Sequence, residues 1–337
     1  MTERMSSSER TSGADRNAGR PSGADRTSGA GPTSCVDRTK GEPVSTNVTD
    51  TALIFEGGGM RASYTSAVVV ALLAAGIHVD WVGGISAGAS NTVNYLTRDA
   101  ERARISFVEF SADPRMGNLG TWLRGKGLFN AEYIYETTGY PGQALPFDFP
   151  TYIANPATMA IGSFRMSDGA MVYWGKDDTP DLPSLMKRVR ASSTMPVLMP
   201  PVTIDGADYL DGALGPTGGF ALDAARAAGY ERFLVVLTQP RTYVKPRLKN
   251  ERLFGRRFRR TPAVVDALIR RPEHYNSTRE ELFELEREGR AMLFVPETMP
   301  VTNGERNVAK LRAAHEQGLA QVRRELPAWR EFLGLDG

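Results

Sequence analysis

Short apolar runs alternate with longer stretches of helical periodicity from residue 51 onward. TALIF at 51–55 and VDWVGGI at 79–85 are compact apolar runs, typical of buried strands. The segments that follow them, 62–76 and 87–97, repeat apolar residues at helical spacing. Because strands separated by helices form βαβ units, this pattern predicts a parallel sheet.

The same alternation continues to about residue 330. It predicts further strands at 157–164, 170–174, 202–204, 208–210, 232–238 and 291–296. It predicts further helices at 102–111, 181–193, 218–228, 263–270, 278–289 and 305–325. No linker interrupts the pattern, so we expect one domain over 49–337 that includes a helical C-terminal extension. Its expected fold class is α/β, with three α/β/α layers around a mostly parallel central sheet.

The first 48 residues have a different composition. Ser, Gly, Thr, Arg and Asp dominate residues 1–48, and SGADR occurs at 12–16 and again at 22–26. Such a segment has too little apolar surface to support a core, so we expect a disordered low-complexity tail. Its basic and acidic residues balance, which argues against nucleic-acid binding through this tail.

Composition and charge narrow the class of protein. The chain has 337 residues, 41% of them hydrophobic, and a net charge of +2, which gives no general attraction to a polyanion such as nucleic acid. The single cysteine, Cys35, excludes an internal disulfide or a cysteine-based metal site. VVVALLAAG at 68–76, among the longest apolar runs, is too short to span a membrane. With no apolar core of a secretory signal at the N-terminus, we expect a cytoplasmic protein.

The second strand-to-helix turn carries the pattern GISAG. Gly84 and Gly88 flank Ser86 two residues away on either side, which matches the G-x-S-x-G nucleophile elbow between a strand and a helix. The small residues let the backbone bend sharply, so that the Ser86 hydroxyl projects at the strand's tip. The amino end of the following helix offers free N–H groups there.

The first strand-to-helix turn carries three glycines and an arginine, in FEGGGMRAS. A right-handed βαβ crossover brings this turn and the Ser86 turn to the same edge of the sheet. Glycines let the backbone N–H groups of Gly57, Gly58 and Gly59 face a substrate with no side chain between, and Arg61 adds positive charge. Such donors stabilise the oxyanion formed when a serine attacks an ester, by about 3–4 kcal/mol per donor.

The same glycines also fit a dinucleotide-binding fingerprint. Gly57, Gly59 and Ala62 satisfy G-x-G-x-x-G/A after a strand. That fingerprint expects an acidic residue at the end of the second strand, whereas the nearby acid, Asp80, is at the strand's beginning. The nucleotide hypothesis is therefore the weaker alternative.

A serine nucleophile needs a base, and the histidines are poor candidates. His78 precedes the second strand, at the opposite edge from Ser86. His274 and His315 lie in or near helical patterns and not on loops after strands. Asp211 is the better candidate, because it follows the short strand DYL and precedes a glycine.

The motifs EGGGMR, GISAG and LDGA occur in that order. With them, the sequence resembles the bacterial branch of the patatin-like phospholipase family over roughly 51–330. The resemblance implies a patatin-like fold and a Ser-Asp dyad that hydrolyses lipid or other acyl esters with no metal and no cofactor. It assigns Ser86 as the nucleophile and Asp211 as the base. It assigns Gly57–Gly59 with Arg61 as the oxyanion loop.

The resemblance extends to RASSTMPVLMPP at 190–201 and to the segment 268–289, and it has two departures. Ala62 and Ala213 stand where members of the family commonly have glycine. Both are small residues, so they bear on detail and not on the dyad. A non-lipolytic esterase or acyltransferase and a catalytically silent binding module remain alternatives, and the pattern leaves the oligomeric state open.

The segment 245–260 is strongly basic. It carries eight basic residues against Glu251, with Leu248, Leu253, Phe254 and Phe258 between them. Two interpretations stay open: transient contact with an anionic membrane surface, or a solvated loop before the next helix.

Overall fold

The computed structural model describes residues 45–117, 120–121, 124–125, 127, 129–249 and 251–336. The predicted tail lies outside these residues, apart from 45–48. Within that short piece, Val48 is buried and forms a parallel bridge with Val79. The described residues belong to one compact unit, which begins at Pro43.

The central sheet has eight strands among the described residues, in the order β5-β6-β3-β2-β1-β7-β8 with β4 on β3. Strands β3, β2, β1, β7 and β8 pair in parallel, and β4, β5 and β6 add antiparallel pairs. The strands are β1 (Thr51–Phe55), β2 (Trp81–Ile85), β3 (Thr158–Arg165), β4 (Met171–Trp174), β5 (Val202–Ile204), β6 (Ala207–Asp211), β7 (Arg232–Val236) and β8 (Ala291–Phe294). All the predicted strands are present, and their ends differ by at most two residues.

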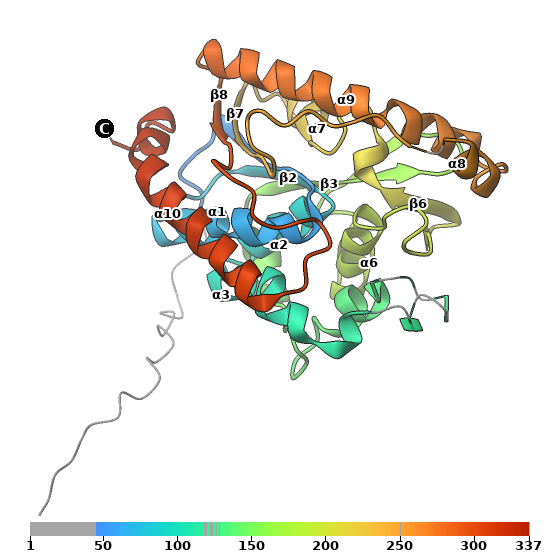
Figure 1. Ribbon diagram of the computed structural model, residues 1–337. Coiled ribbons are helices and arrows are strands. Elements are labelled where there is room, and N and C mark those ends of the chain that lie inside the picture. The colour runs from blue at the N-terminus through green and yellow to red at the C-terminus, as the bar shows by residue number, and fades with distance from the viewer. Residues whose placement is uncertain are drawn as a thin grey trace, which may run out of the picture. The chain divides into compact units, whose positions relative to one another are not determined.

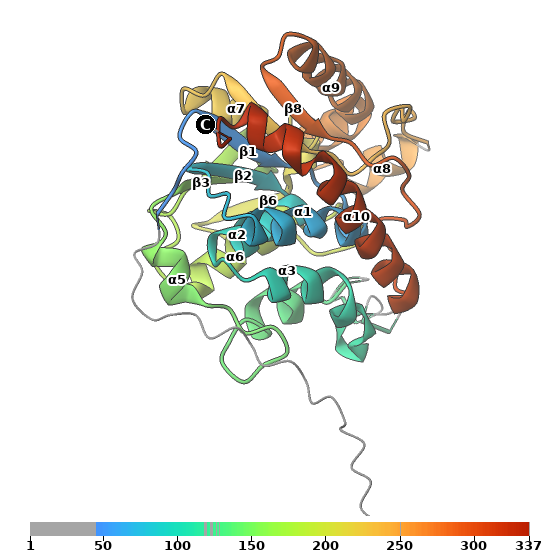
Figure 2. The same ribbon diagram turned by 90° about the vertical axis from the view of Figure 1, so that its left-hand side faces the viewer.

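Helices cover both faces of the sheet, as Figures 1 and 2 show. The helices are α1 (Ala62–Ala74), α2 (Ala87–Leu96), α3 (Ala100–Phe107), α5 (Phe149–Ala154), α6 (Leu182–Ser192), α7 (Leu222–Ala227), α8 (Glu251–Arg257), α9 (Pro262–Arg287) and α10 (Val308–Phe332). Short turns η1 (Gly59–Arg61) and η5 (Gly212–Leu214) and the π-helix η4 (Glu132–Thr137) complete the parts used below.

Side chains from alternate residues of β1 pack into two separate hydrophobic cores, one on each face of the sheet. Leu53 and Phe55 of β1 pack with α1, α2 and α10, whereas Ala52 and Ile54 pack with α7 and α9. A strand buried on both faces reads as a continuous apolar run, which explains why TALIF carries no polar alternation. The three-layer α/β/α prediction is confirmed.

Several predicted helix boundaries are wrong. The helices predicted at 102–111, 218–228 and 305–325 are Ala100–Phe107, Leu222–Ala227 and Val308–Phe332. Two helices were expected at 263–270 and 278–289, but α9 runs unbroken through both, with Pro272 inside it. An internal proline removes one backbone hydrogen bond and costs about 3 kcal/mol. Here Pro272 is buried, as are Leu268 and Tyr275 on the same helix, so the burial of this part of α9 offsets that cost. Helices α5 and α8 and the π-helix were also not predicted.

Among the described residues, no helix combines the length and apolar character needed to cross a membrane.

Candidate functional site

Ser86 occupies a sharp turn between β2 and α2. It is the N-cap residue of α2, with φ 60° and ψ −126°. This is a left-handed conformation that costs a non-glycine residue about 1–3 kcal/mol. The Ser86 amide donates to the hydroxyl of Ser192 on α6 at 2.9 Å, which helps hold the turn. The chain therefore makes the sharp strand-to-helix turn that the glycine spacing predicts.

Close packing explains the two glycines of the elbow. A Cβ atom on Gly88 would lie 2.1 Å from the carbonyl oxygen of Phe55. A Cβ atom on Gly84 would lie 2.3 Å from the backbone of Gly88. No side chain fits at either position, so α2 can begin directly against the ends of β1 and β2.

The glycine run lies against Ser86, as the crossover argument predicts. A Cβ atom on Gly57 would lie 3.0 Å from the Cβ of Ser86. Gly59 has φ 55°, a left-handed value that favours glycine. Its neighbour Met60 donates its amide to the carbonyl of Asn303 at 3.0 Å, which anchors the loop from the C-terminal side.

The three glycine amides are not equivalent. Gly57 donates its N–H to the carbonyl of Gly219 at 3.2 Å. For the amides of Gly58 and Gly59, no described residue acts as acceptor. Ala87, the first residue of α2, has an amide with no partner inside the helix. Gly58, Gly59 and Ala87 therefore carry the available N–H donors near Ser86, and Gly57 provides the space beside it.

Asp211 ends β6 and reaches Ser86. Its carboxylate accepts a hydrogen bond from the Ala213 amide at 2.9 Å, and the Ser86 hydroxyl lies near enough to the carboxylate to favour its charged form. Burial raises the pKa of Asp211, while positive charge at Arg271 and at Lys245 opposes that rise. The structure thus brings two residues that are 125 positions apart close to each other.

Positive charge near Asp211 comes from the C-terminal half of the chain. The Lys245 ammonium lies 4.3 Å from the centroid of the Tyr275 ring, and the Lys245 backbone exchanges two hydrogen bonds with the Asn276 side chain. Burial, together with the charge of Arg271, lowers the pKa of Lys245 to about 8. Arg271 lies one helical turn before Tyr275 on α9, which packs on η5 directly after Asp211.

A buried carboxylate fixes the start of the glycine loop. Glu56 is 2% exposed and accepts a hydrogen bond from the Tyr275 hydroxyl at 2.8 Å. It also accepts one from the amide of Thr238, just after β7. The loop is therefore tied to α9 and to a neighbouring strand. The sequence analysis missed Glu56 and Tyr275, although an acid directly before a glycine run was visible.

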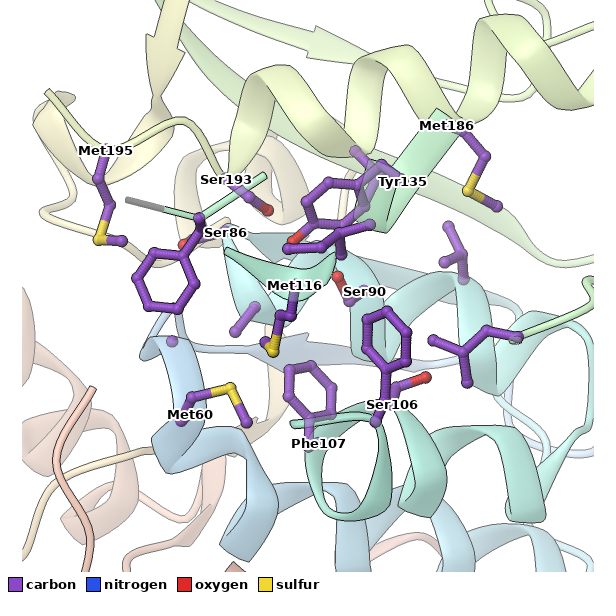
Figure 3. A pocket seen from close by; sticks show the side chains of 18 of the residues that line it. Met60, Ser86, Ser90, Ser106, Phe107, Met116, Tyr135, Met186, Ser193 and Met195 are labelled. Atoms are coloured by element: carbon purple, nitrogen blue, oxygen red, sulfur yellow. The ribbon is translucent and has the colours of Figure 1, made fainter. Parts of the chain in front are cut away.

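A largely apolar cavity opens beside Ser86 (Figure 3). Met60, Ser86, Phe107 and Met116 surround it in the picture. Its wall is formed mainly by α2, α3, η4 and α6 and the segment after α6. Besides Ser86, the polar side chains in the wall are Ser90, Arg102, Ser106, Tyr135, Ser193 and Asn303. Apolar side chains make up most of the wall: Met60, Val93, Phe107, Phe110, Met116, Phe129, Ile134, Leu145, Met186, Val189, Met195 and Met199. Such a wall suits an alkyl chain.

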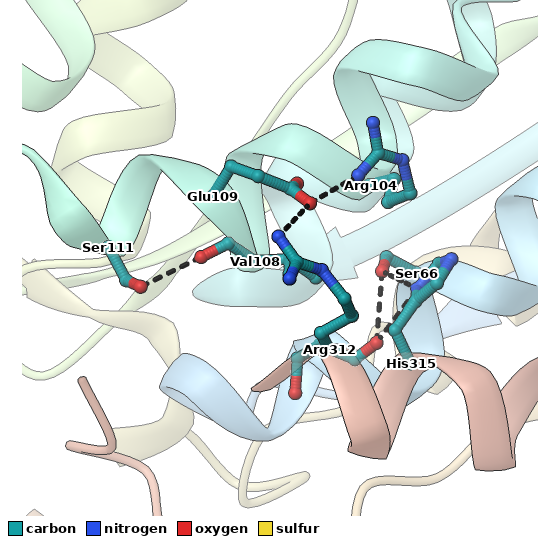
Figure 4. A network of polar contacts seen from close by, with 8 residues as sticks. Ser66, Arg104, Val108, Glu109, Ser111, Arg312 and His315 are labelled. Atoms are coloured by element: carbon teal, nitrogen blue, oxygen red, sulfur yellow. Dashed lines mark hydrogen bonds and ion pairs between the residues drawn. The ribbon is translucent and has the colours of Figure 1, made fainter. Parts of the chain in front are cut away.

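None of the three histidines lines this cavity. His315 of α10 is buried, with Nδ1 at 3.1 Å from both the Ser66 hydroxyl and the Ser63 carbonyl of α1 (Figure 4). Burial lowers the pKa of His78 to about 4. His274 lies on α9. These positions agree with the expectation that the histidines are not the base.

The basic segment folds back onto the domain. Leu248, Phe254 and Phe258 pack in a small core with Phe164 and Leu210. Residues 251–257 form α8, so the loop interpretation of this part was wrong. These three apolar side chains serve the domain's own core, and its arginines face solvent. These exposed arginines are Arg247, Arg252, Arg256, Arg257, Arg259 and Arg260.

Within the described parts of the chain, no group of three or more His, Cys, Asp or Glu side chains is close enough to hold a metal ion.

Comparisons with known proteins give two family-level matches. A family model described as patatin-like phospholipase matches residues 53–221, and a domain of unknown function, DUF6363, matches residues 261–334. No curated protein matches. Among solved structures, VipD from Legionella pneumophila is similar at 11% identity and a TM-score of 0.42, over 82% of this chain and 67% of that one. Because the first match covers half of the chain and includes both turns, Ser86 and Asp211, the protein belongs to the patatin-like phospholipase family.

Proposed function

We propose that this protein is a serine acyl hydrolase of phospholipase A or lysophospholipase type, which cleaves carboxylic esters of lipids through a Ser86–Asp211 dyad. Family membership supports hydrolysis of lipid esters in general. One observation carries the more specific proposal. The Asp211 carboxylate, which accepts from the Ala213 amide, lies beside the Ser86 hydroxyl at the edge of an apolar cavity.

The reaction has two halves. Asp211 accepts the hydroxyl proton as Ser86 Oγ attacks the ester carbonyl, and the protonated carboxyl then gives that proton to the leaving alcohol. In the second half, Asp211 takes a proton from water, which attacks the acyl-enzyme. The tetrahedral intermediate collapses, Ser86 recovers its proton, and the fatty acid leaves.

Backbone N–H groups stabilise the oxyanion in both halves. In this proposal the donors are the amides of Gly58, Gly59 and Ala87. The amide of Gly57 remains hydrogen-bonded to the Gly219 carbonyl. One such donor contributes about 3–4 kcal/mol to the transition state. Arg61 adds positive charge next to the loop.

The C-terminal helices belong to the hydrolase domain in this proposal. Arg271 and Tyr275 lie outside residues 53–221, yet one stabilises the charge on Asp211 and the other holds Glu56. We therefore extend the functional domain over 49–337. A cytoplasmic protein that contacts anionic membranes transiently through its exposed arginines fits the same proposal.

Turnover of esters of increasing chain length tests this proposal. We expect hydrolysis of acyl esters by the wild-type protein, with preference for chains long enough to fill the apolar cavity, and no turnover by Ser86→Ala. Ser90→Ala is the matched control, because Ser90 lines the same cavity one turn along α2. Equal turnover by wild type and Ser86→Ala would refute the assignment, and absence of turnover in the wild type on every ester would favour a silent binding module.

A further inference from the structure

A second hollow lies beside the active-site cavity. It is a groove of about 400 Å³. Its walls include Met166, Val197 and Leu210. Met199 borders both the groove and the active-site cavity, and Leu210 directly precedes Asp211. The groove and the dyad are therefore separated by a thin wall.

Three arginines line one side of this groove. Arg257, Arg259 and Arg260 are exposed, and Phe258 between them is only 5% exposed because it packs in the core under α8. Because Phe258 is held in the core, the arginines on either side of it point away from that core. No described acidic side chain forms an ion pair with any of the three arginines. The groove therefore presents uncompensated positive charge.

The opposite side of the groove is apolar and partly open to solvent. Val197 is 41% exposed and has φ 70°, an unfavourable conformation for a β-branched residue. An exposed valine next to three arginines fits a ligand that is anionic at one end and apolar at the other. Free phosphate or a nucleic-acid backbone would use the arginines but would gain nothing from the apolar wall.

We propose that this groove binds the phosphate head group of an anionic phospholipid in a membrane, and thereby places the active-site cavity at the bilayer surface. The arginines contact the phosphate, and Val197 and Met166 contact the adjoining glycerol and acyl carbons. This inference deepens the proposed function, since it names anionic glycerophospholipid as the class of lipid at the site. It differs from diffuse charge attraction because it depends on particular arginines of the basic segment.

Two triple variants with equal charge separate these possibilities. The groove variant is Arg257→Gln/Arg259→Gln/Arg260→Gln. The control variant is Arg247→Gln/Arg252→Gln/Arg256→Gln, which removes three exposed arginines of the same segment that do not line the groove. Both are made in the Ser86→Ala protein, so that hydrolysis does not alter the vesicles.

Co-sedimentation with vesicles gives the readout. On vesicles of phosphatidylglycerol and phosphatidylcholine, the control loses affinity through net charge alone, and we expect the groove variant to bind about tenfold more weakly than the control. Vesicles of phosphatidylcholine alone should show no such difference. Equal losses by the two variants, or no loss by the groove variant, would overturn the proposal.

Two further measurements keep this result separate from the hydrolase proposal. Turnover of a water-soluble short-chain ester by the groove variant with Ser86 intact should equal that of wild type, which shows that the dyad and the fold survive. If the wild type hydrolyses no ester, the vesicle experiment still tests the groove. Displacement of the protein from anionic vesicles by millimolar inorganic phosphate alone would contradict the need for the apolar wall, and retention would support it.

Discussion

Two regions of the molecule build the candidate site in different ways. The segment that matches the patatin-like phospholipase model supplies Ser86, Asp211 and the glycine loop through backbone geometry, such as a positive φ at Ser86 and bare N–H groups. The region after residue 221 supplies side chains, namely Arg271 and Lys245 near Asp211 and Tyr275 on Glu56.

The difference teaches which properties follow from local sequence. A turn that needs glycine can be recognised from a few adjacent residues, because no other side chain fits there. A charge from a distant segment gives no such local pattern, since the packing of α9 is what brings Arg271 near Asp211. In the proposed mechanism, the first region supplies the reacting groups, and the second region adjusts the pH range of the reaction and the rigidity of the site.

The largest effect is expected at Asp211. Asp211→Asn keeps the size of the side chain but cannot accept the serine proton, so we expect kcat to fall by about 10³-fold or more. The fold should survive, because a buried charge is removed and the amide oxygen can still accept from the Ala213 amide. Steady-state turnover and a thermal melt measure the two effects. Near-normal turnover would show that another group is the base.

Gly88→Ala should disrupt the elbow itself. The new Cβ would lie 2.1 Å from the Phe55 carbonyl oxygen, so α2 must shift and carry Ser86 out of place. We expect loss of turnover together with destabilisation of about 1–3 kcal/mol, the usual cost of an overpacked core. Gly255→Ala is the control, since nothing lies within 4 Å of that Cβ position. A fully active, stable Gly88→Ala protein would contradict the packing argument.

Arg271→Gln tests the second region through pH. Burial raises the pKa of Asp211 and Arg271 opposes this, so removing Arg271 should raise that pKa further. Because the base acts as the carboxylate, activity falls as the pH drops through its pKa. The acidic limb of kcat/KM should therefore move to higher pH, with activity regained in alkaline buffer. Arg270→Gln, at an exposed neighbouring position, should leave the profile unchanged. An identical pH profile for Arg271→Gln would show that the charge of Arg271 does not affect the pKa of Asp211.

The smallest effect is expected at Tyr275. Tyr275→Phe removes the hydroxyl that donates to Glu56, and a buried acceptor that loses one of its donors costs about 1–3 kcal/mol. We expect a lower Tm with a modest loss of kcat, as the glycine loop loses one anchor. Tyr140→Phe changes an exposed tyrosine and should alter neither quantity. If Tyr275→Phe matched that control, Glu56 would not depend on α9.

The sequence predicted those parts that depend on neighbouring residues. The strands, both turns and the approach of the glycine run to Ser86 follow from apolar runs, glycine spacing and the handedness of βαβ units. Two helices were predicted at 263–270 and 278–289 where the folded chain has one, and this hid the fact that Arg271 and Tyr275 share one continuous helix. The basic segment showed its charge, but its apolar residues pack inward against a core that exists only in the folded chain.

Site-mapped labelling by a fluorophosphonate probe is the most direct test of the central claim. The probe reacts with an activated serine, so mass spectrometry of the labelled wild-type protein should place one adduct on Ser86. The Ser86→Ala protein should carry none, and Asp211→Asn should label far more slowly. Labelling of Ser86→Ala at the wild-type rate would contradict the account.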